Sequence, residues 1–230
     1  VLQAPGVAEL VLDRSETGQF FLERELRRLA PAATLDVVLA NLNDSERLAA
    51  VFEQFRPEIL FHAAAYKHVP LMELHPGEAV KNIALATRNL VDLAHDFEVS
   101  AFVMISTDKA VNPTSVMGSC KQLAERYVQA KALESATRFV TVRFGNVLDS
   151  AGSVVPIFRE QIARGGPVTV THPDIIRYFM LIPEAAQLVI EAGAMGQGGE
   201  IFVLYMGQPV NFVDLARDMI RLSGLRENED

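Results

Sequence analysis

The sequence predicts an α/β fold built on a doubly wound parallel sheet. In the first 150 residues, short β-rich apolar runs alternate with segments whose apolar residues recur at helical spacing. Strands that alternate with helices are joined by right-handed crossovers, which produce a parallel sheet. After about residue 150 the pattern becomes mainly helical. We therefore expect a Rossmann-like sheet in residues 1–150, interleaved with a small C-terminal region in residues 151–230.

The elements follow in order from these patterns. In the first region, apolar runs that end in polar residues or turns predict strands at 9–13, 35–39, 58–62, 101–106 and 138–146. Helical spacing between them predicts helices at 18–30, 45–55, 77–97 and 115–135. In the second region we expect helices at 155–164, 183–192 and 210–223, with short strands at 168–171 and 201–204.

Composition excludes several classes of function. The 230 residues are half apolar and carry a formal net charge of −8, which suits one good core and disfavours a nucleic-acid surface. The one cysteine excludes an intramolecular disulfide and a cysteine-based metal site. No apolar run is long enough to span a membrane. We expect no metal, no nucleic-acid partner and no membrane contact from this segment, and a cytoplasmic location, with a membrane anchor on a longer parent chain left open.

One stretch concentrates the reactive side chains. The apolar run that begins at Phe102 ends in Ser106, Thr107, Asp108 and Lys109, and Met117 and Lys121 follow four residues apart on an expected helix. Residues i and i+4 share a helix face, so both should point toward the carboxyl end of the strand. Open α/β sheets bind ligands at that edge.

Two other strand ends suggest a dinucleotide site. Asp13 ends the first expected strand, where an acid holds ribose hydroxyls in such sites, although an ordinary strand-to-turn acid is the alternative. Ala63, Ala64 and Ala65 allow a flat cofactor to approach the backbone, although a packing seam would also use them. His62 before them is more typical of a packing histidine than of a catalyst. No G-x-G-x-x-G turn occurs in the sequence.

Four long runs carry a family resemblance. They are HAAAYKHVPLME, ISTDKAVNPTSVMGSCK, RFGNVLDSAGSVVPIF and IIRYFMLIPEAAQLV. They resemble the nucleotide-sugar 4,6-dehydratases of polysaccharide biosynthesis, in the extended short-chain dehydrogenase/reductase superfamily, from Val7 to about Leu225. Met117 stands where the superfamily usually has its catalytic tyrosine, and this branch resembles enzymes that act on UDP-N-acetylglucosamine.

The resemblance implies an activity and its residues. It implies NAD-dependent dehydration of a UDP-N-acetylhexosamine to the 4-keto-6-deoxy sugar, for capsule, lipopolysaccharide or other glycan synthesis. Asp108 is then the acid at C6 and Lys109 the base at C5, which requires a lowered lysine pKa. Thr107 bonds the 4-oxygen, and Lys121 supplies positive charge and holds the nicotinamide ribose. A homo-oligomer formed through the 115–135 helix is also implied.

The same resemblance implies which residues bind the cofactor and the substrate. For NAD they are Asp13, Arg14, Ser15, Asn41, His62, Ala63, Ala64, Ala65 and Lys121. For the UDP-sugar they are Lys67, Asn146, Pro156, Thr169, Thr171 and Arg177, with a surface ion pair as the alternative for Arg177.

Several features depart from the family pattern. Asp149 stands where glycine is usual, Tyr205 replaces an aspartate, and the glycine turn is absent. In the 3-2-1-4-5-6 strand order of this fold the missing first strand is central, so two neighbouring strands should have unpaired edges. We expect a piece cropped from a longer chain, with a strand supplied by a partner as the alternative. A catalytically inactive sugar-nucleotide-binding relative and a UDP-sugar 4-epimerase or reductase remain alternative functions.

Overall fold

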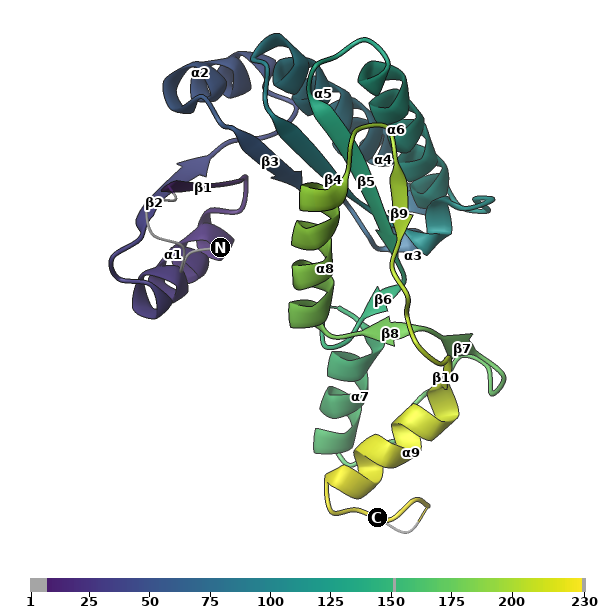
Figure 1. Ribbon diagram of the computed structural model, residues 1–230. Helices are drawn as coiled ribbons and strands as arrows, with labels where there is room; N and C mark the ends of the chain where they lie inside the picture. The colour runs from purple at the N-terminus through teal and green to yellow at the C-terminus, as the bar shows by residue number, and fades with distance from the viewer. Residues whose placement is uncertain (1–7, 151, 229–230) are drawn as a thin grey trace.

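The computed structural model describes residues 8–150 and 152–228. Its centre is a parallel sheet in the order β3 (Ile59–His62), β4 (Ala101–Thr107), β5 (Arg138–Phe144) and β9 (Ile201–Val203). Three helices, α2 (Ser45–Phe55), α5 (Ala86–Asp96) and α6 (Val116–Ala132), cover one face, and α8 (Ile182–Met195) covers the other (Figure 1). The predicted α/β class is confirmed.

Strand β4 shows why the sheet lies between two helical layers. Its side chains alternate between the two faces, as the pleat requires. Phe102 and Met104 are buried in the core against α2, α5 and α6, whereas Val103 is buried with Val189 of α8. A strand apolar on both faces is typical of a parallel sheet covered on both sides.

The sheet is interrupted where the sequence predicted. Strands β1 (Ala8–Asp13) and β2 (Thr34–Leu39) form a separate parallel pair, flanked by α1 (Glu16–Leu29). Within the described ranges, β1 pairs only with β2, and β3 pairs only with β4. Figure 1 shows this unit set apart from the larger sheet. The facing edges of β1 and β3 are therefore unpaired, as expected.

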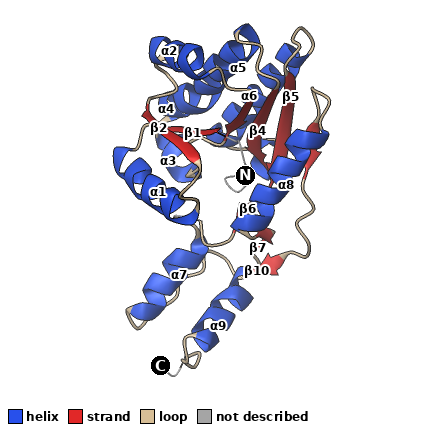
Figure 2. Ribbon diagram, turned by 60° about the vertical axis from the view of Figure 1, so that its left-hand side comes forward, coloured by secondary structure: helices blue, strands red, loops and turns tan. Residues whose placement is uncertain are grey.

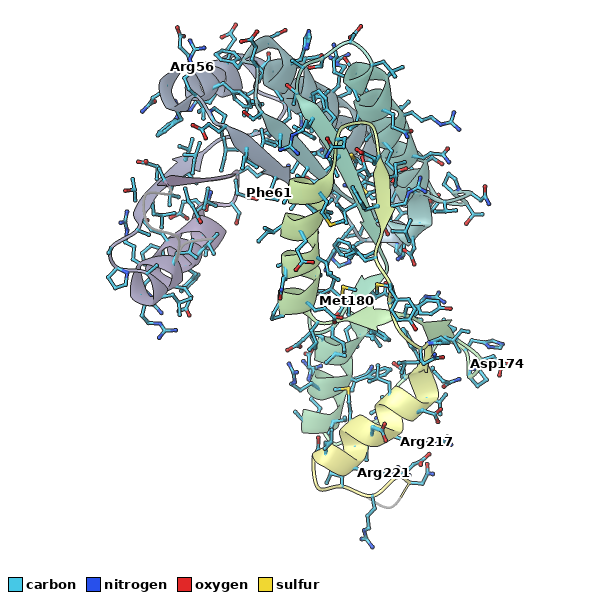
Figure 3. The ribbon with its side chains drawn as sticks, viewed as in Figure 1. Arg56, Phe61, Asp174, Met180, Arg217 and Arg221 are labelled. Atoms are coloured by element: carbon cyan, nitrogen blue, oxygen red, sulfur yellow. The ribbon has the colours of Figure 1, made fainter. Side chains whose placement is uncertain are left out.

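A second group of elements lies beyond the carboxyl ends of β4 and β5. Helices α7 (Val154–Ala163) and α9 (Phe212–Leu222) extend away from the sheet side by side (Figure 2). Two short strand pairs join them to it, β6 (Asn146–Val147) with β8 (Phe179–Met180) and β7 (Ile176–Arg177) with β10 (Val210–Asn211). Met180 is buried near the start of α8 (Figure 3). The chain then returns to the sheet through α8 and β9.

Some expected elements differ. The strand at 168–171 is wrong: this segment is irregular, because Gly165 and Gly166 take positive φ before Pro167 and the Thr169 amide donates to Gln161 instead of to a strand. The strand expected at 138–146 divides at Gly145, where a Cβ would lie 3.5 Å from the Tyr178 carbonyl oxygen of the segment that leads into β8.

The helix expected at 77–97 is also more complex. It comprises α4 (Pro76–Ala79), a π-helical turn η1 (Val80–Leu85) and α5. The additional short helix α3 (Val69–Leu74) precedes it. The last helix begins at Phe212 rather than at residue 210, because the Asn211 side chain accepts hydrogen bonds from the next two free amides.

The expected ends of the two regions are only partly described. Residues 1–7, including Val7, residue 151 and residues 229–230 lie outside the described residues. The division into 1–150 and 151–230 stays a prediction. No helix in the described part of the chain is long and apolar enough to cross a membrane.

Candidate active site

The densest group of reactive side chains lies at the carboxyl end of β4. The chain leaves the strand at Thr107 and makes one 3₁₀ turn, η2 (Asp108–Ala110). The Thr107 hydroxyl donates to Asp108 Oδ1 over 2.9 Å, and Lys109 Nζ donates to the same oxygen over 2.9 Å. Lys109 Nζ also donates to Asn146 Oδ1 over 3.3 Å. Four predicted site residues therefore form one hydrogen-bonded cluster, which we call the strand-end cluster.

The strand-end cluster is accessible. The side chains of Lys109 and Asp108 are 37% and 49% exposed, so a ligand can reach both. A carboxyl and an amine in direct contact can exchange a proton, which gives this cluster both an acid and a base.

Gly118 brings helix α6 against the strand-end cluster. A Cβ on Gly118 would lie 2.3 Å from the carbonyl oxygen of Lys109 and 3.1 Å from Pro113 Cβ. The Ser115 hydroxyl caps the helix by accepting from the Gly118 amide. The close approach explains why glycine is needed in the M-G-S-C-K run.

Met117 and Lys121 have different surroundings although they lie one turn apart. Met117 is 3% exposed and packs in an apolar cluster with Met72, Ile83 and Cys120. Lys121 is also buried, and its Nζ donates to the Ile105 carbonyl over 2.8 Å. Burial lowers the pKa of Lys121 to about 8, and the charge of Glu125 acts in the opposite direction.

His62 is buried and hydrogen-bonded. Its Nε2 lies 2.9 Å from the Thr87 hydroxyl, which donates to the Ile83 carbonyl over 2.6 Å. Since the hydroxyl proton is used there, His62 Nε2 carries the proton of its bond to Thr87. Burial, and then the charge of Lys121, lowers the pKa of His62 to about 3. His62 is therefore neutral near pH 7.

Six of the nine predicted cofactor residues line one cavity of about 370 Å³ between β1, β2 and the loop after β3, whereas Ser15, His62 and Lys121 are not part of its lining. Its lining includes the expected Asp13, Arg14, Asn41, Ala63, Ala64 and Ala65. Its lining also includes Tyr66 and Asn82. Arg14 joins them: its guanidinium lies 4.6 Å from the Tyr66 ring centroid, donates to the Tyr66 hydroxyl and donates to Asn82 Oδ1 over 3.0 Å.

Two of the expected cofactor residues, Ser15 and Asn41, make local bonds. The Ser15 hydroxyl caps α1 by accepting from the Gly18 amide, while the Ser15 amide donates to Asp13 Oδ1 over 2.7 Å. Asn41 Oδ1 accepts from the Asn43 amide over 3.0 Å. These bonds fix the orientation of the Asp13 carboxylate at the rim of the cavity.

The predicted sugar-nucleotide residues are not all brought together. Asn146 belongs to the strand-end cluster, and Lys67 Nζ donates to Ser150 Oγ over 3.4 Å. Pro156 lies in the first turn of α7. The structure does not bring Thr169, Thr171 and Arg177 into contact with the strand-end cluster: all three are exposed, Thr169 bonds to Gln161, and Arg177 donates to the Ile176 carbonyl.

Asp149, where the family has glycine, adopts a left-handed conformation with φ of 59°. Glycine adopts this conformation without steric cost, which accounts for the usual residue. The Asp149 carboxylate is half exposed and pairs with Arg159 over 3.1 Å. Its charge is therefore turned toward solvent and a cation. Tyr205, the other departure, is 80% exposed.

The structure also contains a buried polar network that sequence reasoning missed. Glu125 of α6 accepts hydrogen bonds from Ser106 and from Arg143 of β5. The spacing of Glu125, four residues after Lys121, was the available signal. Within the described residues, no group of three or more histidine, cysteine or acidic side chains could hold a metal ion.

Comparisons with known proteins agree with the motifs. The family described as polysaccharide biosynthesis protein matches residues 2–230. The chain is 56% identical over 193 residues to the capsular polysaccharide biosynthesis protein CapD of Staphylococcus aureus, covering 84% of this chain and 32% of CapD. The chain thus spans about a third of that relative.

Solved structures show the same fold. The crystal structure of Pen from Bacillus thuringiensis is similar with a TM-score of 0.88 and 34% identity, over 96% of this chain and 69% of Pen. DesIV of Streptomyces venezuelae, described as a dTDP-glucose 4,6-dehydratase with NAD bound, is similar with a TM-score of 0.86 and 18% identity, over 97% of this chain and 74% of that chain. The resemblance seen in the motifs is confirmed, and the chain belongs to the polysaccharide biosynthesis protein family.

Proposed function

We propose that this chain carries the active site of an NAD-dependent nucleotide-sugar 4,6-dehydratase that acts on a UDP-N-acetylhexosamine, with UDP-N-acetylglucosamine as the first candidate. The contact between Asp108 and Lys109 in the strand-end cluster carries the proposal. Loss of water across C5 and C6 needs a base and an acid at adjacent positions. A simple 4-epimerase needs no such pair, so the contact favours the dehydratase.

The residues of the cavity fit the adenosine half of NAD. Asp13 presents a carboxylate of the kind that accepts from ribose hydroxyls, and three successive alanines leave the backbone uncovered. DesIV is described with NAD bound, which supports the same cofactor here. When bound, NAD would supply the acceptor for hydride from C4 and return that hydride to C6.

The strand-end cluster can supply the acid and the base of the elimination. Transfer of one proton from Lys109 Nζ to Asp108 Oδ1 converts the ion pair into a neutral amine and a carboxylic acid. A bound sugar that excludes water favours the neutral form of such a pair. Lys109 then takes the C5 proton, Asp108 gives its proton to the departing C6 hydroxyl, and water leaves. When hydride returns to C6, Lys109 gives a proton back to C5. The proton lost by the 4-hydroxyl on oxidation of C4 would pass to solvent, and Lys109 would take a proton from solvent, which restores the ion pair after each turnover.

Other side chains would position the sugar. The Thr107 hydroxyl, already part of the cluster, would bond the 4-oxygen, and the amide of Asn146 would orient the ring opposite Lys109. Lys67 and Pro156 would face the diphosphate, and Thr169, Thr171 and Arg177 would face the nucleotide. In this proposal residues 1–150 bind the dinucleotide and residues 151–230 bind the UDP-sugar. The expected homo-oligomer and cytoplasmic location stay predictions.

The test is a proton-exchange experiment on the intact protein. UDP-N-acetylglucosamine is incubated in D₂O with the wild type, with Asp108→Asn and with Lys109→Met, and the sugar is followed by NMR. Lys81→Met is the matched control, because Lys81 pairs with Glu78 on the exposed side of η1. We expect a 4-keto-6-deoxy product with deuterium at C5 from the wild type and the control, and none from the two site variants.

Two results would overturn the proposal. Bound NAD without any sugar turnover in the wild type would favour the inactive sugar-nucleotide-binding relative. A product epimerised at C4, with C5 unlabelled, would favour the epimerase.

A further inference from the structure

A buried polar network lies directly behind the strand-end cluster. Glu125 is 1% exposed, and its Oε1 accepts from the Ser106 hydroxyl over 2.6 Å and from Arg143 Nε over 2.8 Å. Arg143 Nη2 donates to Oε2, which makes the ion pair bidentate. We call these three residues the Glu125 network. Its bonds satisfy a carboxylate that could not otherwise be buried in charged form.

The Glu125 network joins three elements. Ser106 of β4 and Arg143 of β5 are register partners, so their side chains leave the sheet on the same face, toward α6. Each contributes a donor to one carboxylate on that helix. The carboxylate therefore fixes the ends of both strands against α6.

Lys121 is attached to the same strand end. It precedes Glu125 by one helical turn, and its Nζ bonds the carbonyl of Ile105, the residue before Ser106. Two successive residues of β4 are thus bonded by two side chains that are one turn apart on α6. The next residues of the chain are Thr107, Asp108 and Lys109.

We propose that Glu125 is a positioning residue: its buried negative charge keeps Lys121 protonated, and its bond to Ser106 fixes the strand end that presents Asp108 and Lys109. This inference rests on the proposed function. A network needed only for folding would not require ions, because well-packed apolar side chains often replace a buried ion pair without loss of stability.

The charges around Lys121 favour this role. Burial alone opposes its ammonium form, and the Glu125 carboxylate is the opposing charge. The other charged or titratable groups lie on α3 (Glu73), α4 (Glu78), η1 (Lys81), α5 (Arg88, Asp92, His95 and Asp96), η2 (Asp108 and Lys109) and β5 (Arg138 and Arg143), with His62 of β3 also close enough to interact with Lys121. Glu73 accepts from the Val116 amide, and Glu78 pairs with Lys81 at the surface. Neither is bonded at the buried end of Lys121.

The test follows Lys121 itself by NMR, so it does not depend on turnover. The intact protein is labelled with lysine carrying ¹³C at Cε, and the Lys121 resonance is assigned by its loss in Lys121→Arg. Glu125→Gln keeps the shape but removes the charge, and should lower the pH midpoint of Lys121 by about one unit or more, tenfold in proton affinity. Arg143→Gln removes a cation and leaves the Glu125 carboxylate, so it should raise the pH midpoint of Lys121.

Glu134→Gln is the matched control, because Glu134 is exposed, pairs with Lys131 and should leave the midpoint unchanged. In Glu125→Gln we also expect the basic limb of the turnover profile to move to lower pH by the same amount, with the KM for the sugar unchanged.

Opposite shifts in the two network variants support the proposal. A lower melting temperature in both variants, with the Lys121 midpoint unmoved, would show a purely structural role and overturn it. Because the two variants are independent, one that fails to fold leaves the other to decide. Opposite shifts without sugar turnover in the wild type would support the control of Lys121 by Glu125 and reject only the dehydratase.

Discussion

Substitution of Gly118 by alanine should separate activity from stability. The new Cβ would lie 2.3 Å from the Lys109 carbonyl oxygen, whereas unstrained carbon–oxygen contacts are about 1 Å longer. Either α6 or η2 must therefore move by about that distance. A misplacement of about 1 Å of a catalytic group can reduce turnover about 100-fold. We expect that loss, since the carbonyl belongs to the proposed base.

The stability effect should be smaller. Overpacking costs about 1–3 kcal/mol. Alanine in a helix recovers up to about 1 kcal/mol relative to glycine. The free energy of unfolding should therefore fall by about 2 kcal/mol or less. A 100-fold loss of turnover corresponds to about 2.7 kcal/mol of activation free energy, so activity should suffer more than folding.

The assay is steady-state turnover of the UDP-sugar beside urea unfolding, on the intact protein. Gly77→Ala is the matched control, because Gly77 is also in a helix and a Cβ there meets nothing within 4 Å. The control should keep full turnover. Unchanged turnover in Gly118→Ala, with the expected small loss of stability, would refute the argument that the helix contact positions Lys109.

Three other predictions follow from burial and conformation. The pKa of His62 is about 3 when folded, against about 6.5 unfolded, so the free energy of unfolding should fall by up to ~4 kcal/mol as the pH is lowered from about 6.5 to about 3. Urea unfolding at several pH values should show this fall, and His62→Gln should reduce the pH dependence. Asp149→Asn keeps a residue that tolerates positive φ and removes the charge, and should lower the KM for the UDP-sugar by up to about fivefold. Leu48→Ala removes a fully buried side chain from the inner face of α2 and should lower the free energy of unfolding in urea by about 2–5 kcal/mol.

Each has a contrary outcome. If the free energy of unfolding of His62→Gln still falls to the same extent at acid pH, the loss of stability belongs to other groups. An unchanged KM in Asp149→Asn would show that the pair with Arg159 already screens the carboxylate. A loss well below 1 kcal/mol in Leu48→Ala would mean that the core around α2 relaxes into the space.

The sequence predicted best where local pattern and tertiary packing agree. Strand β4 is apolar on both faces and ends in polar residues, so its position and the cluster at its end were both predictable. Asp13 and Ala63 could likewise be assigned to one edge of the sheet, since the carboxyl ends of parallel strands share an edge. The cavity brings those residues together.

The errors have a common cause. Residues 168–171 alternate valine and threonine like a strand, but among the described residues no strand pairs with them, and Thr169 instead forms hydrogen bonds with Gln161. The π-helical turn that brings Asn82 to the cavity also has no signal in helical periodicity. In the sequence, Arg143 looks like a surface arginine, because its ion pair with Glu125 forms only in the folded protein. The contacts of Thr169 and Arg143 depend on partners eight or more residues away, which local periodicity does not report.

The lysines of this site show how one residue type is given different tasks by its surroundings. Lys109 lies against Asp108 at an accessible strand end, where its proton can be exchanged with a carboxylate and then with a sugar. Lys121 is buried one helical turn from Glu125, where burial lowers its pKa to about 8 and the Glu125 carboxylate opposes that shift. In the proposed dehydratase, a mobile proton on Lys109 beside a constant charge on Lys121 would let the base be regenerated at every turnover while the field around it stays constant. The Glu125 network is what would keep those two tasks separate.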